Sequence, residues 1–267
     1  MDLELEGKRA LVSGSSAGIG EAIAYALTDE GATVAVHGRS SERVEQVVKN
    51  TEARGGHAVG VLADLTSPSG AHQLASEARH ALGGIDILIN NAGEYANRTW
   101  QEARPQDWEQ LYRSNVVSAV ALIRELVPAM RSTGWGRVIQ ISSGEATNPF
   151  PVMPDYSATK AALVNMTVSL SKDLARSGVT ANTISPGIIV TPGVEAFYRT
   201  VAAERGWGDA WEDIEQGVLR EFLDNPCGRL GHVEEVASLT AFLSSPRADY
   251  LNGANFRIDG GATAVIN

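Results

Sequence analysis

Near its start the chain reads Arg9-Ala10-Leu11-Val12-Ser13-Gly14-Ser15-Ser16-Ala17-Gly18-Ile19-Gly20, an apolar run that passes directly into a glycine-rich turn. The run Arg9–Ser13 has the length and composition of a buried strand. Behind the glycines, apolar residues repeat at helical spacing: Ile19, Ala22, Ile23, Ala26 and Leu27. A glycine turn between a strand and a helix lets backbone N–H groups approach a phosphate at the positive end of the helix dipole. This segment therefore predicts a βα unit that binds a nucleotide.

The rest of the chain continues this alternation. Six more strands are expected at Thr33–His37, Ala58–Leu62, Ile85–Asn90, Arg137–Ser142, Thr180–Ser185 and Asn255–Ile258. The amphipathic segments between them are about 10–25 residues long, which is typical of βαβ units and a parallel sheet. The chain has 267 residues and no internal repeat or linker, so one domain covering residues 1–267 is expected.

One region interrupts the alternation. Residues 192–226 form a long insert before the last strand and hold five of the sixteen aromatic residues: Phe197, Tyr198, Trp207, Trp211 and Phe222. The insert is either a peripheral helical pair with its own small core or a lid over an apolar ligand. We favour a substrate lid, because the insert follows the carboxyl end of a strand, where ligands of open α/β sheets bind.

Composition excludes several classes of protein. The formal net charge of −10 repels phosphate backbones, so no nucleic-acid partner is expected. The single cysteine, Cys227, cannot form an internal disulfide, and no Cys/His cluster has metal-binding spacing. The acidic start of the chain lacks the features of a signal peptide, and no window is long enough to span a membrane. A cytoplasmic protein without a metal is expected.

The end of the second strand bears on the choice of nucleotide. It reads His37-Gly38-Arg39-Ser40 and has no carboxylate to bind a ribose 2′-hydroxyl. Arg39 and Ser40 could hold a 2′-phosphate instead, which favours NADP(H) over NAD(H), although Arg39 could also be a solvated surface charge. Asp64, after the third strand, is either a turn residue or an acceptor for an adenine amino group.

A second pattern predicts acid–base chemistry. Tyr156 and Lys160 lie four residues apart at the start of an apolar helix, so they share one face. A free phenol has a pKa of about 10, and a nearby ammonium group lowers it toward the range useful for proton transfer. Ser142-Ser143 ends a strand at the same sheet edge, and a serine hydroxyl there could polarise a carbonyl oxygen.

Asn115 belongs to the same region of the predicted fold. It falls in an apolar stripe on the helix that follows the fourth strand, and a buried amide needs hydrogen-bond partners. It either forms a structural hydrogen bond to a neighbouring strand or holds a water that connects Lys160 to solvent.

Taken together, these motifs resemble the short-chain dehydrogenase/reductase family of the single-domain Rossmann-fold type, and within it 3-oxoacyl-[acyl-carrier-protein] reductase-like members. The matching pieces are SGSSAGIG (13–20), ADL (63–65), NNAG (90–93), Asn115, ISS (141–143), YSATK (156–160), SPG with Thr191 (185–191) and RIDGG (257–261). One departure is Ser13, where the family usually has threonine. The resemblance implies a doubly wound α/β fold with a seven-stranded parallel sheet in the order 3-2-1-4-5-6-7 and helices on both faces.

The resemblance also implies roles for residues. The catalytic tetrad would be Asn115, Ser143, Tyr156 and Lys160. The cofactor contacts would be Gly14, Ser16, Gly18, Ile19, Gly20, Arg39, Ser40, Asp64, Leu65, Asn91, Ala92, Gly93, Tyr156, Lys160, Pro186, Gly187, Ile189 and Thr191. The reaction would be NAD(P)(H)-dependent interconversion of a ketone and a secondary alcohol. The alternatives are a non-catalytic dinucleotide-binding redox sensor and a lyase- or dehalogenase-like relative. The family also implies a homotetramer, or a homodimer.

The substrate wall is expected between the cofactor motifs and the lid. Its predicted residues are Glu94, Tyr95, Glu145, Asn148, Phe150, Val152 and Met153. We favour an interpretation in which both carboxylates point to solvent, over one in which Glu94 or Glu145 binds a substrate hydroxyl or amine. The aromatic lid indicates a fairly apolar small-molecule ketone, such as a 3-oxoacyl, cyclic or aromatic one. An acidic carrier-protein partner is disfavoured by the net charge, unless Arg98, Arg104 and Arg131 form a basic patch.

Overall fold

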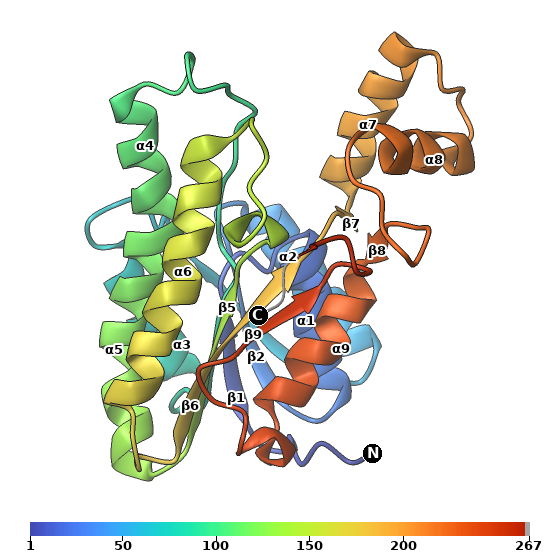
Figure 1. The fold of residues 1–267 in the computed structure, drawn as a ribbon. Helices are drawn as coiled ribbons and strands as arrows, with labels where there is room; N and C mark the ends of the chain where they lie inside the picture. Colours follow the sequence, from blue (N-terminus) through green and yellow to red (C-terminus); the bar gives the residue numbers. More distant parts are fainter. Residues whose placement is uncertain (265–267) are drawn as a thin grey trace.

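The computed structural model describes residues 1–264, and its centre is a seven-stranded parallel sheet (Figure 1). The strand order is β3-β2-β1-β4-β5-β6-β9. The strands are β1 (Arg9–Val12), β2 (Thr33–Gly38), β3 (His57–Leu62), β4 (Ile87–Asn90), β5 (Gly136–Ile141), β6 (Val179–Pro186) and β9 (Asn255–Ile258). This order confirms the predicted topology, because β9 is the last of the seven strands expected from the sequence.

Helices cover both faces of this sheet. One face carries α1 (Gly18–Asp29), α2 (Ser41–Ala53) and α9 (Val233–Ser244). The opposite side carries α3 (Gly70–Leu82), α4 (Pro105–Tyr112), α5 (Ser118–Thr133) and α6 (Pro154–Asp173). Between residues 1 and 264, no helix combines the length and apolarity needed to cross a membrane.

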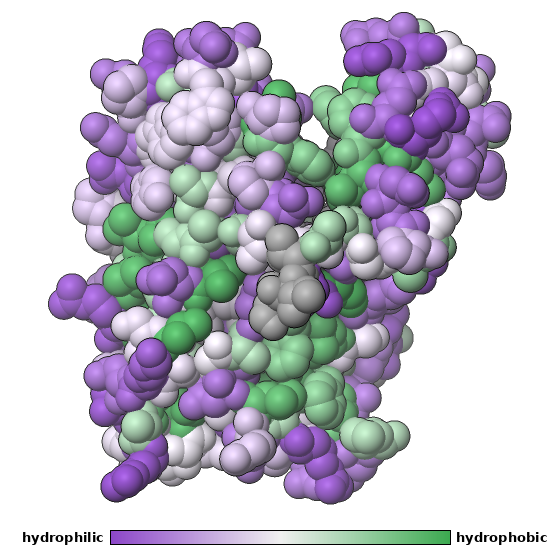
Figure 2. All heavy atoms as spheres, in the orientation of Figure 1, coloured by the Kyte–Doolittle hydropathy of each residue, from purple (hydrophilic) through white to green (hydrophobic). Residues whose placement is uncertain are grey.

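The predicted lid forms a separate arm beside the sheet. It consists of α7 (Pro192–Arg205) and α8 (Trp211–Glu221), which stand away from the body in Figure 1. Two short strands, β7 (Ile189–Val190) and β8 (Gly231–His232), pair at its base. The space-filling view shows a cleft between this arm and the body (Figure 2). The sequence did not predict β7 and β8, because two residues are too few to show a periodic pattern.

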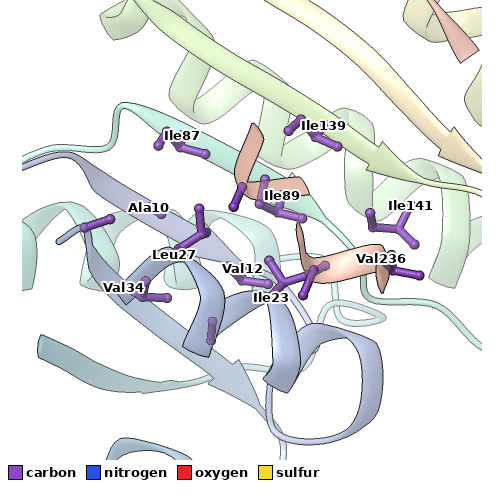
Figure 3. Packing of buried hydrophobic residues seen from close by; sticks show 14 of the residues in the cluster. Ala10, Val12, Ile23, Leu27, Val34, Ile87, Ile89, Ile139, Ile141 and Val236 are labelled. Carbon is purple, nitrogen blue, oxygen red and sulfur yellow. The ribbon is translucent and has the colours of Figure 1, made fainter. Parts of the chain in front are cut away.

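Strand alternation divides the core into two layers. Ala10 and Val12 of β1 point to the face under α1 and α9, whereas Leu11 points to the face under α3 and α5. Figure 3 shows the first layer, in which Ile23 of α1 and Val236 of α9 pack beside the branched residues of the strands. Both faces of the sheet are therefore apolar, as expected for a parallel sheet, and the polar chemistry lies at the carboxyl ends of the strands.

Candidate active site

A cavity of about 1300 Å³ runs along the carboxyl ends of the strands, from the glycine turn to the lid. It is lined by the glycine turn, the loops after β2, β3 and β4, the loop from β5 to α6, and the segment that leads into α7. These segments are far apart in the sequence and meet because parallel strands end at one edge. Most of the predicted site residues line this cavity.

The glycine turn leaves no room for side chains. A methyl group on Gly14 would lie 2.9 Å from the Cα of Ala92, and one on Gly20 would lie 2.4 Å from the Gly14 carbonyl oxygen. Gly14 and Gly18 also have φ values of +66° and +60°, which favour glycine. The backbone and the amino end of α1 therefore face the cavity directly, as phosphate binding requires.

Side chains from β1 and β4 fix this turn. The Ser13 hydroxyl accepts hydrogen bonds from the backbone N–H groups of Asn91 and Ala92, both at 3.0 Å. The Asn91 amide donates in return to the carbonyls of Ser13 and Gly14, also at 3.0 Å. Serine thus supplies the hydroxyl at the position where the resemblance implied threonine. The side chain of Asn91 orders the turn.

His37 is a further support that the sequence did not single out. Its Nδ1 accepts from the Gly14 N–H at 2.9 Å, and its Nε2 lies 3.2 Å from the Ala63 carbonyl oxygen. These partners require the neutral ring with the proton on Nε2. Burial lowers the pKa of His37, in agreement with that state. The only signal in the sequence was a histidine in an otherwise apolar strand.

At the adenosine end of the cavity, two arginines lie where the sequence predicted one. Arg39 and Arg43 both line the cavity, and Arg39 forms an ion pair of 3.3 Å with Glu94 across it. Ser40, predicted to help hold a 2′-phosphate, lies outside the lining and instead caps α2 by accepting from the Arg43 N–H at 3.4 Å. A serine just before a helix commonly has this role.

Asp64 is a turn residue, one of the two interpretations offered for it, and its contact with adenine stays a prediction. Its Oδ1 accepts from the N–H and the hydroxyl of Thr66, at 2.9 and 2.7 Å, which makes it a turn residue. These hydrogen bonds lower its pKa and keep it ionised. The residue also lines the cavity beside Leu65, so its remaining oxygen is available to a ligand.

Tyr156 and Ser143 meet on the cavity wall. Tyr156 is in the first turn of α6, and both Tyr156 and Ser143 line the cavity. Removal of water from the phenol raises its pKa, and the nearby Ser143 side chain opposes that shift. The sequence predicted a lowered pKa, and this is wrong for the structure, because burial outweighs the effect of Ser143, and Glu145 and Tyr95 raise the pKa of Tyr156 further.

Lys160 and Asn115 lie behind this wall. The Lys160 Nζ donates to the Ile141 carbonyl at 2.9 Å and lies 5.5 Å from the centre of the Tyr156 ring. Burial lowers the pKa of Lys160 to about 8. A methyl group on Gly93 would lie 3.3 Å from the Asn115 Oδ1 and 3.5 Å from the Lys160 Nζ. All four predicted catalytic residues are thus gathered around one point.

A π-helical turn, η1 (Arg113–Val117), sets the position of Asn115 between α4 and α5. The amide accepts from the Glu94 N–H at 2.8 Å and donates to the Glu94 carbonyl at 2.9 Å. It also donates to the Thr159 hydroxyl at 3.0 Å. Asn115 therefore makes structural hydrogen bonds, but to the loop after β4 and to α6 instead of the predicted neighbouring strand, and the water relay to Lys160 stays a prediction.

The segment after β6 closes the cavity near Tyr156. Pro186, Gly187, Ile189 and Thr191 all line it, as predicted from the motif. The Thr191 hydroxyl accepts from the Val194 N–H at 3.2 Å and so begins α7. Its methyl group lies 3.4 Å from the position that a methyl group on Gly18 would take. The base of the lid is therefore held against the glycine turn.

The substrate wall matches the predicted set. The body contributes Glu94, Tyr95, Glu145, Asn148, Phe150, Val152 and Met153, and the lid contributes Val194, Phe197, Tyr198 and Phe222. Trp207 and Trp211 instead pack into a small core inside the lid. The insert therefore has the small internal core of one interpretation, and some of its aromatic residues also line the cavity, while its role as a lid stays a prediction.

The two carboxylates do not both point to solvent. Glu145 is buried, and its Oε2 accepts a hydrogen bond from the Ser157 hydroxyl, so the favoured prediction was wrong for this residue. Burial raises its pKa. The side chain of Glu94 is 35% exposed and is held by Arg39 and by the Ser114 hydroxyl, at 3.3 and 3.2 Å.

The three arginines considered as a basic patch are all paired with carboxylates, and Arg131 lies apart from the other two. Arg98 and Arg104 both pair with Asp107, and Arg98 also reaches the buried Asp155 at 3.2 Å. Arg131 pairs with Asp173 at the far end of α5. The part of the chain that the structure describes has no cluster of acidic, histidine and cysteine residues suited to a metal.

Comparison with known proteins agrees with this site. Residues 8–201 match the family model described as short chain dehydrogenase. The chain is 36% identical to the uncharacterized oxidoreductase YvaG of Bacillus subtilis (strain 168), with both chains fully covered. It is 31% identical to the 3-oxoacyl-[acyl-carrier-protein] reductase FabG of Escherichia coli (strain K12), over 98% of this chain and 100% of the relative.

Solved structures of reductases have the same fold as this chain. The L-sorbose reductase of Gluconobacter frateurii, complexed with NADPH and L-sorbose, is 34% identical and superposes with a TM-score of 0.94 over the whole of both chains. A 3-oxoacyl (acyl-carrier-protein) reductase of Agrobacterium tumefaciens with NADP bound is 32% identical, with a TM-score of 0.87 over 97% of this chain and 96% of the other. On the family model, the sequence identity and the fold together, the chain belongs to the short-chain dehydrogenase/reductase family and is an oxidoreductase.

Proposed function

We propose that the protein is an NADP(H)-dependent oxidoreductase that interconverts a ketone and a secondary alcohol, with Tyr156 as the acid/base. The observation that carries this proposal is that Ser143 and Tyr156 line the wall of the same cavity that begins at the glycine turn. One cavity thus joins a phosphate-binding backbone to a proton donor.

The residues present fit a dinucleotide. The backbone of the glycine turn and the amino end of α1 would hold its pyrophosphate, because no side chain intervenes there. The hydroxyls of the nicotinamide ribose would bind Tyr156 and Lys160, and the segment from Pro186 to Thr191 would contact the carboxamide. When bound, the nicotinamide supplies or accepts a hydride, and in its oxidised form it carries a positive charge.

Tyr156 and Ser143 would handle the substrate oxygen. In reduction, the Ser143 hydroxyl orients the carbonyl oxygen and Tyr156 donates its proton to it. The raised pKa of Tyr156 suits this direction, because the phenol stays protonated at neutral pH. In oxidation, the phenolate accepts the proton of the alcohol. This direction therefore requires the pKa of Tyr156 to fall when cofactor and substrate are bound. A water between Asn115 and Lys160 would reprotonate Tyr156.

The preference for NADP(H) rests on the charges at the adenosine end. Arg39 and Arg43 both line the cavity there, and a 2′-phosphate would form charge-assisted hydrogen bonds with them. The L-sorbose reductase and the Agrobacterium reductase, which are similar over nearly the whole chain, contain NADPH and NADP. We expect Arg39→Ala to raise the KM for NADPH about tenfold or more and leave the KM for NADH nearly unchanged.

The oligomeric state is part of the same proposal. The outer faces of α5 and α6 carry exposed valines at Val117, Val120 and Val168. Figure 2 shows apolar side chains over these two helices. Such a surface supports association of copies of the chain, and a homotetramer is the arrangement proposed here.

The test is NADPH oxidation with a panel of ketones. Wild-type protein should oxidise NADPH only when a ketone is present, and Tyr156→Phe should lower kcat by about 100- to 10,000-fold while NADPH still binds. Arg54→Ala is the control for Arg39→Ala, because Arg54 pairs with Asp29 and does not line the cavity. Tight NADPH binding without turnover of any ketone or alcohol would favour a redox sensor instead.

A further inference from the structure

The carboxylate of Glu145 is placed where a substrate would lie. It belongs to the short turn η2 (Gly144–Ala146), directly after Ser143, and the residue is only 9% exposed. Its backbone N–H donates to the Ser143 hydroxyl at 3.2 Å, so the two side chains leave the same turn. Glu145 also lines the cavity.

Within residues 1–264, one side-chain donor reaches this carboxylate: the Ser157 hydroxyl binds Oε2. No hydrogen bond of the described residues engages Oε1. Oε1 is not closed off inside the protein, so a donor in the cavity can reach it. A hydrogen bond to a charged acceptor is stronger than one between neutral groups, so a ligand that brings a donor to Oε1 would be recognised there.

The carboxylate lies close to Tyr156. Its Oε2 binds the hydroxyl of Ser157, which directly follows Tyr156 in α6, and Glu145 lines the same cavity as Tyr156 and Tyr198 of the lid. The ring of Tyr95 is 6.1 Å from that of Tyr156. A ligand whose carbonyl oxygen meets Ser143 and Tyr156 would present its neighbouring carbon to Glu145.

The surroundings favour a neutral donor. Lys160 is directly behind Tyr156, so a cationic ligand would meet a positive charge beside the reacting carbonyl. Much of the remaining wall is apolar, with Phe150, Phe197 and Phe222 around the cavity. A hydroxyl group fits both conditions, and an ammonium group does not.

We propose that Glu145 determines substrate specificity by accepting a hydrogen bond from a hydroxyl on the carbon next to the reacting carbonyl. The preferred substrates are therefore α-hydroxy ketones, and the corresponding products are vicinal diols. This inference rests on the proposed function and names the substrate class for the same site. The apolar lid covers the rest of the substrate.

A matched pair of ketones tests the proposal. In 1-hydroxy-2-butanone a hydroxyl stands where 3-pentanone has a methyl group, so size and reacting carbonyl are nearly the same. Wild-type protein should reduce the hydroxy ketone with a kcat/KM about tenfold or more above that of 3-pentanone. Glu145→Gln should reduce this ratio about tenfold, because a neutral amide accepts more weakly than a carboxylate.

Glu94→Gln is the matched control, because it neutralises the other carboxylate on the wall. It should change both ketones by the same factor and leave their ratio as in the wild type. Glu145→Asp keeps the negative charge but has a shorter side chain, so its carboxylate lies farther from the substrate. It tests the proposal if the glutamine variant does not fold. Thermal unfolding and NADPH affinity show whether each variant is intact.

The outcomes separate the two proposals. Equal kcat/KM values for the pair in the wild type, or an unchanged ratio in both Glu145 variants, would overturn the role of Glu145. Tyr156-dependent turnover in the same assays would leave the proposed reaction standing. Absence of turnover with both ketones and with the wider ketone panel would overturn the proposed reaction itself, and the role of Glu145 with it.

Discussion

At the scale of single residues, the chemistry depends on how the protein sets the proton affinity of Tyr156. Burial raises the pKa of the phenol, and among the described residues only the side chain of Ser143 lowers it. Lys160 donates to a backbone carbonyl, and its own pKa falls to about 8 because it is buried. The protein side chains alone therefore prepare Tyr156 as an acid.

Ser143→Ala tests how far the Ser143 hydroxyl lowers the pKa of Tyr156. Loss of the hydroxyl removes the group that lowers the Tyr156 pKa, so oxidation of an alcohol, which needs the phenolate, should shift to more alkaline pH. The substrate oxygen also loses a donor, and kcat should fall about 100-fold or more. Rate profiles against pH in both directions measure the effect.

Ser143→Thr is the control, because it restores the hydroxyl. Recovery of the wild-type pH profile in this variant would assign the shift to the hydroxyl. An alanine variant with an unchanged profile and kcat would show that Ser143 does not act on Tyr156.

At the scale of elements, β2 supports the glycine turn through one imidazole. His37 Nδ1 accepts the Gly14 N–H, and Nε2 contacts the Ala63 carbonyl. Protonation would place an N–H opposite the Gly14 N–H. Burial and the charge of Arg39 lower the pKa of His37, whereas the Ala63 carbonyl and the carboxylate of Asp64 raise it.

This arrangement predicts a pH dependence of stability and cofactor binding. The folded state holds fewer protons on His37 than the unfolded chain, whose imidazole titrates near pH 6.5. The stabilisation is thus fully present above about pH 6.5 and is lost as the pH falls below it. NADPH affinity and the melting temperature should decline together in acid.

His37→Leu tests that dependence. It leaves the Gly14 N–H without its acceptor, which should lower the free energy of unfolding by about 1–3 kcal/mol and weaken NADPH binding. Its acid-side decline should be smaller than that of the wild type. Identical acid profiles for the two proteins would exclude His37 as the titrating group.

The lid is a second element with its own stability. Trp207 packs on Gly217, where a methyl group would lie 2.2 Å from the indole ring, and its N–H donates to Glu221 at 2.9 Å. Gly217→Ala should therefore disturb the lid core by about 1–3 kcal/mol. Because Tyr198 and Phe222 pack at the same core, kcat/KM should fall while NADPH affinity stays near the wild-type value.

Tryptophan fluorescence and steady-state kinetics measure this effect. Thr200→Ala, at an exposed position of α7, is the matched control and should change neither quantity. A Gly217→Ala variant with wild-type kcat/KM would show that the packing of the lid does not shape the substrate site.

At the scale of the whole molecule, the exposed faces of α5 and α6 predict association. Val117, the last residue of η1, and Val120 of α5 lie one turn apart, and they are 56% and 39% exposed. Val120→Glu would place a charge within a buried interface, so the proposed tetramer should dissociate into smaller species. Light scattering coupled to gel filtration gives the mass directly. A wild-type monomer, or a variant with unchanged mass, would contradict this interface.

Much of the site could be predicted from local patterns. The glycine turn, the Tyr156–Lys160 spacing and the apolar strands depend on neighbours in the sequence, and the structure gathers Asn115, Ser143, Tyr156 and Lys160 as expected. The strand order followed from resemblance and agrees with the structure. Local spacing suffices for these features, because the period of a strand or helix determines which residues share a face.

The sequence by itself determined the fold class, the order of the motifs and the edge of the sheet where they meet. Only the tertiary structure decided that Glu145 is buried on Ser157, that Ser40 caps α2 while Arg43 faces the cavity, and that burial raises the pKa of Tyr156. The physical reason is that burial and hydrogen-bond partners are set by elements distant in the chain. A sequence pattern shows which face a side chain is on, but desolvation depends on what covers that face.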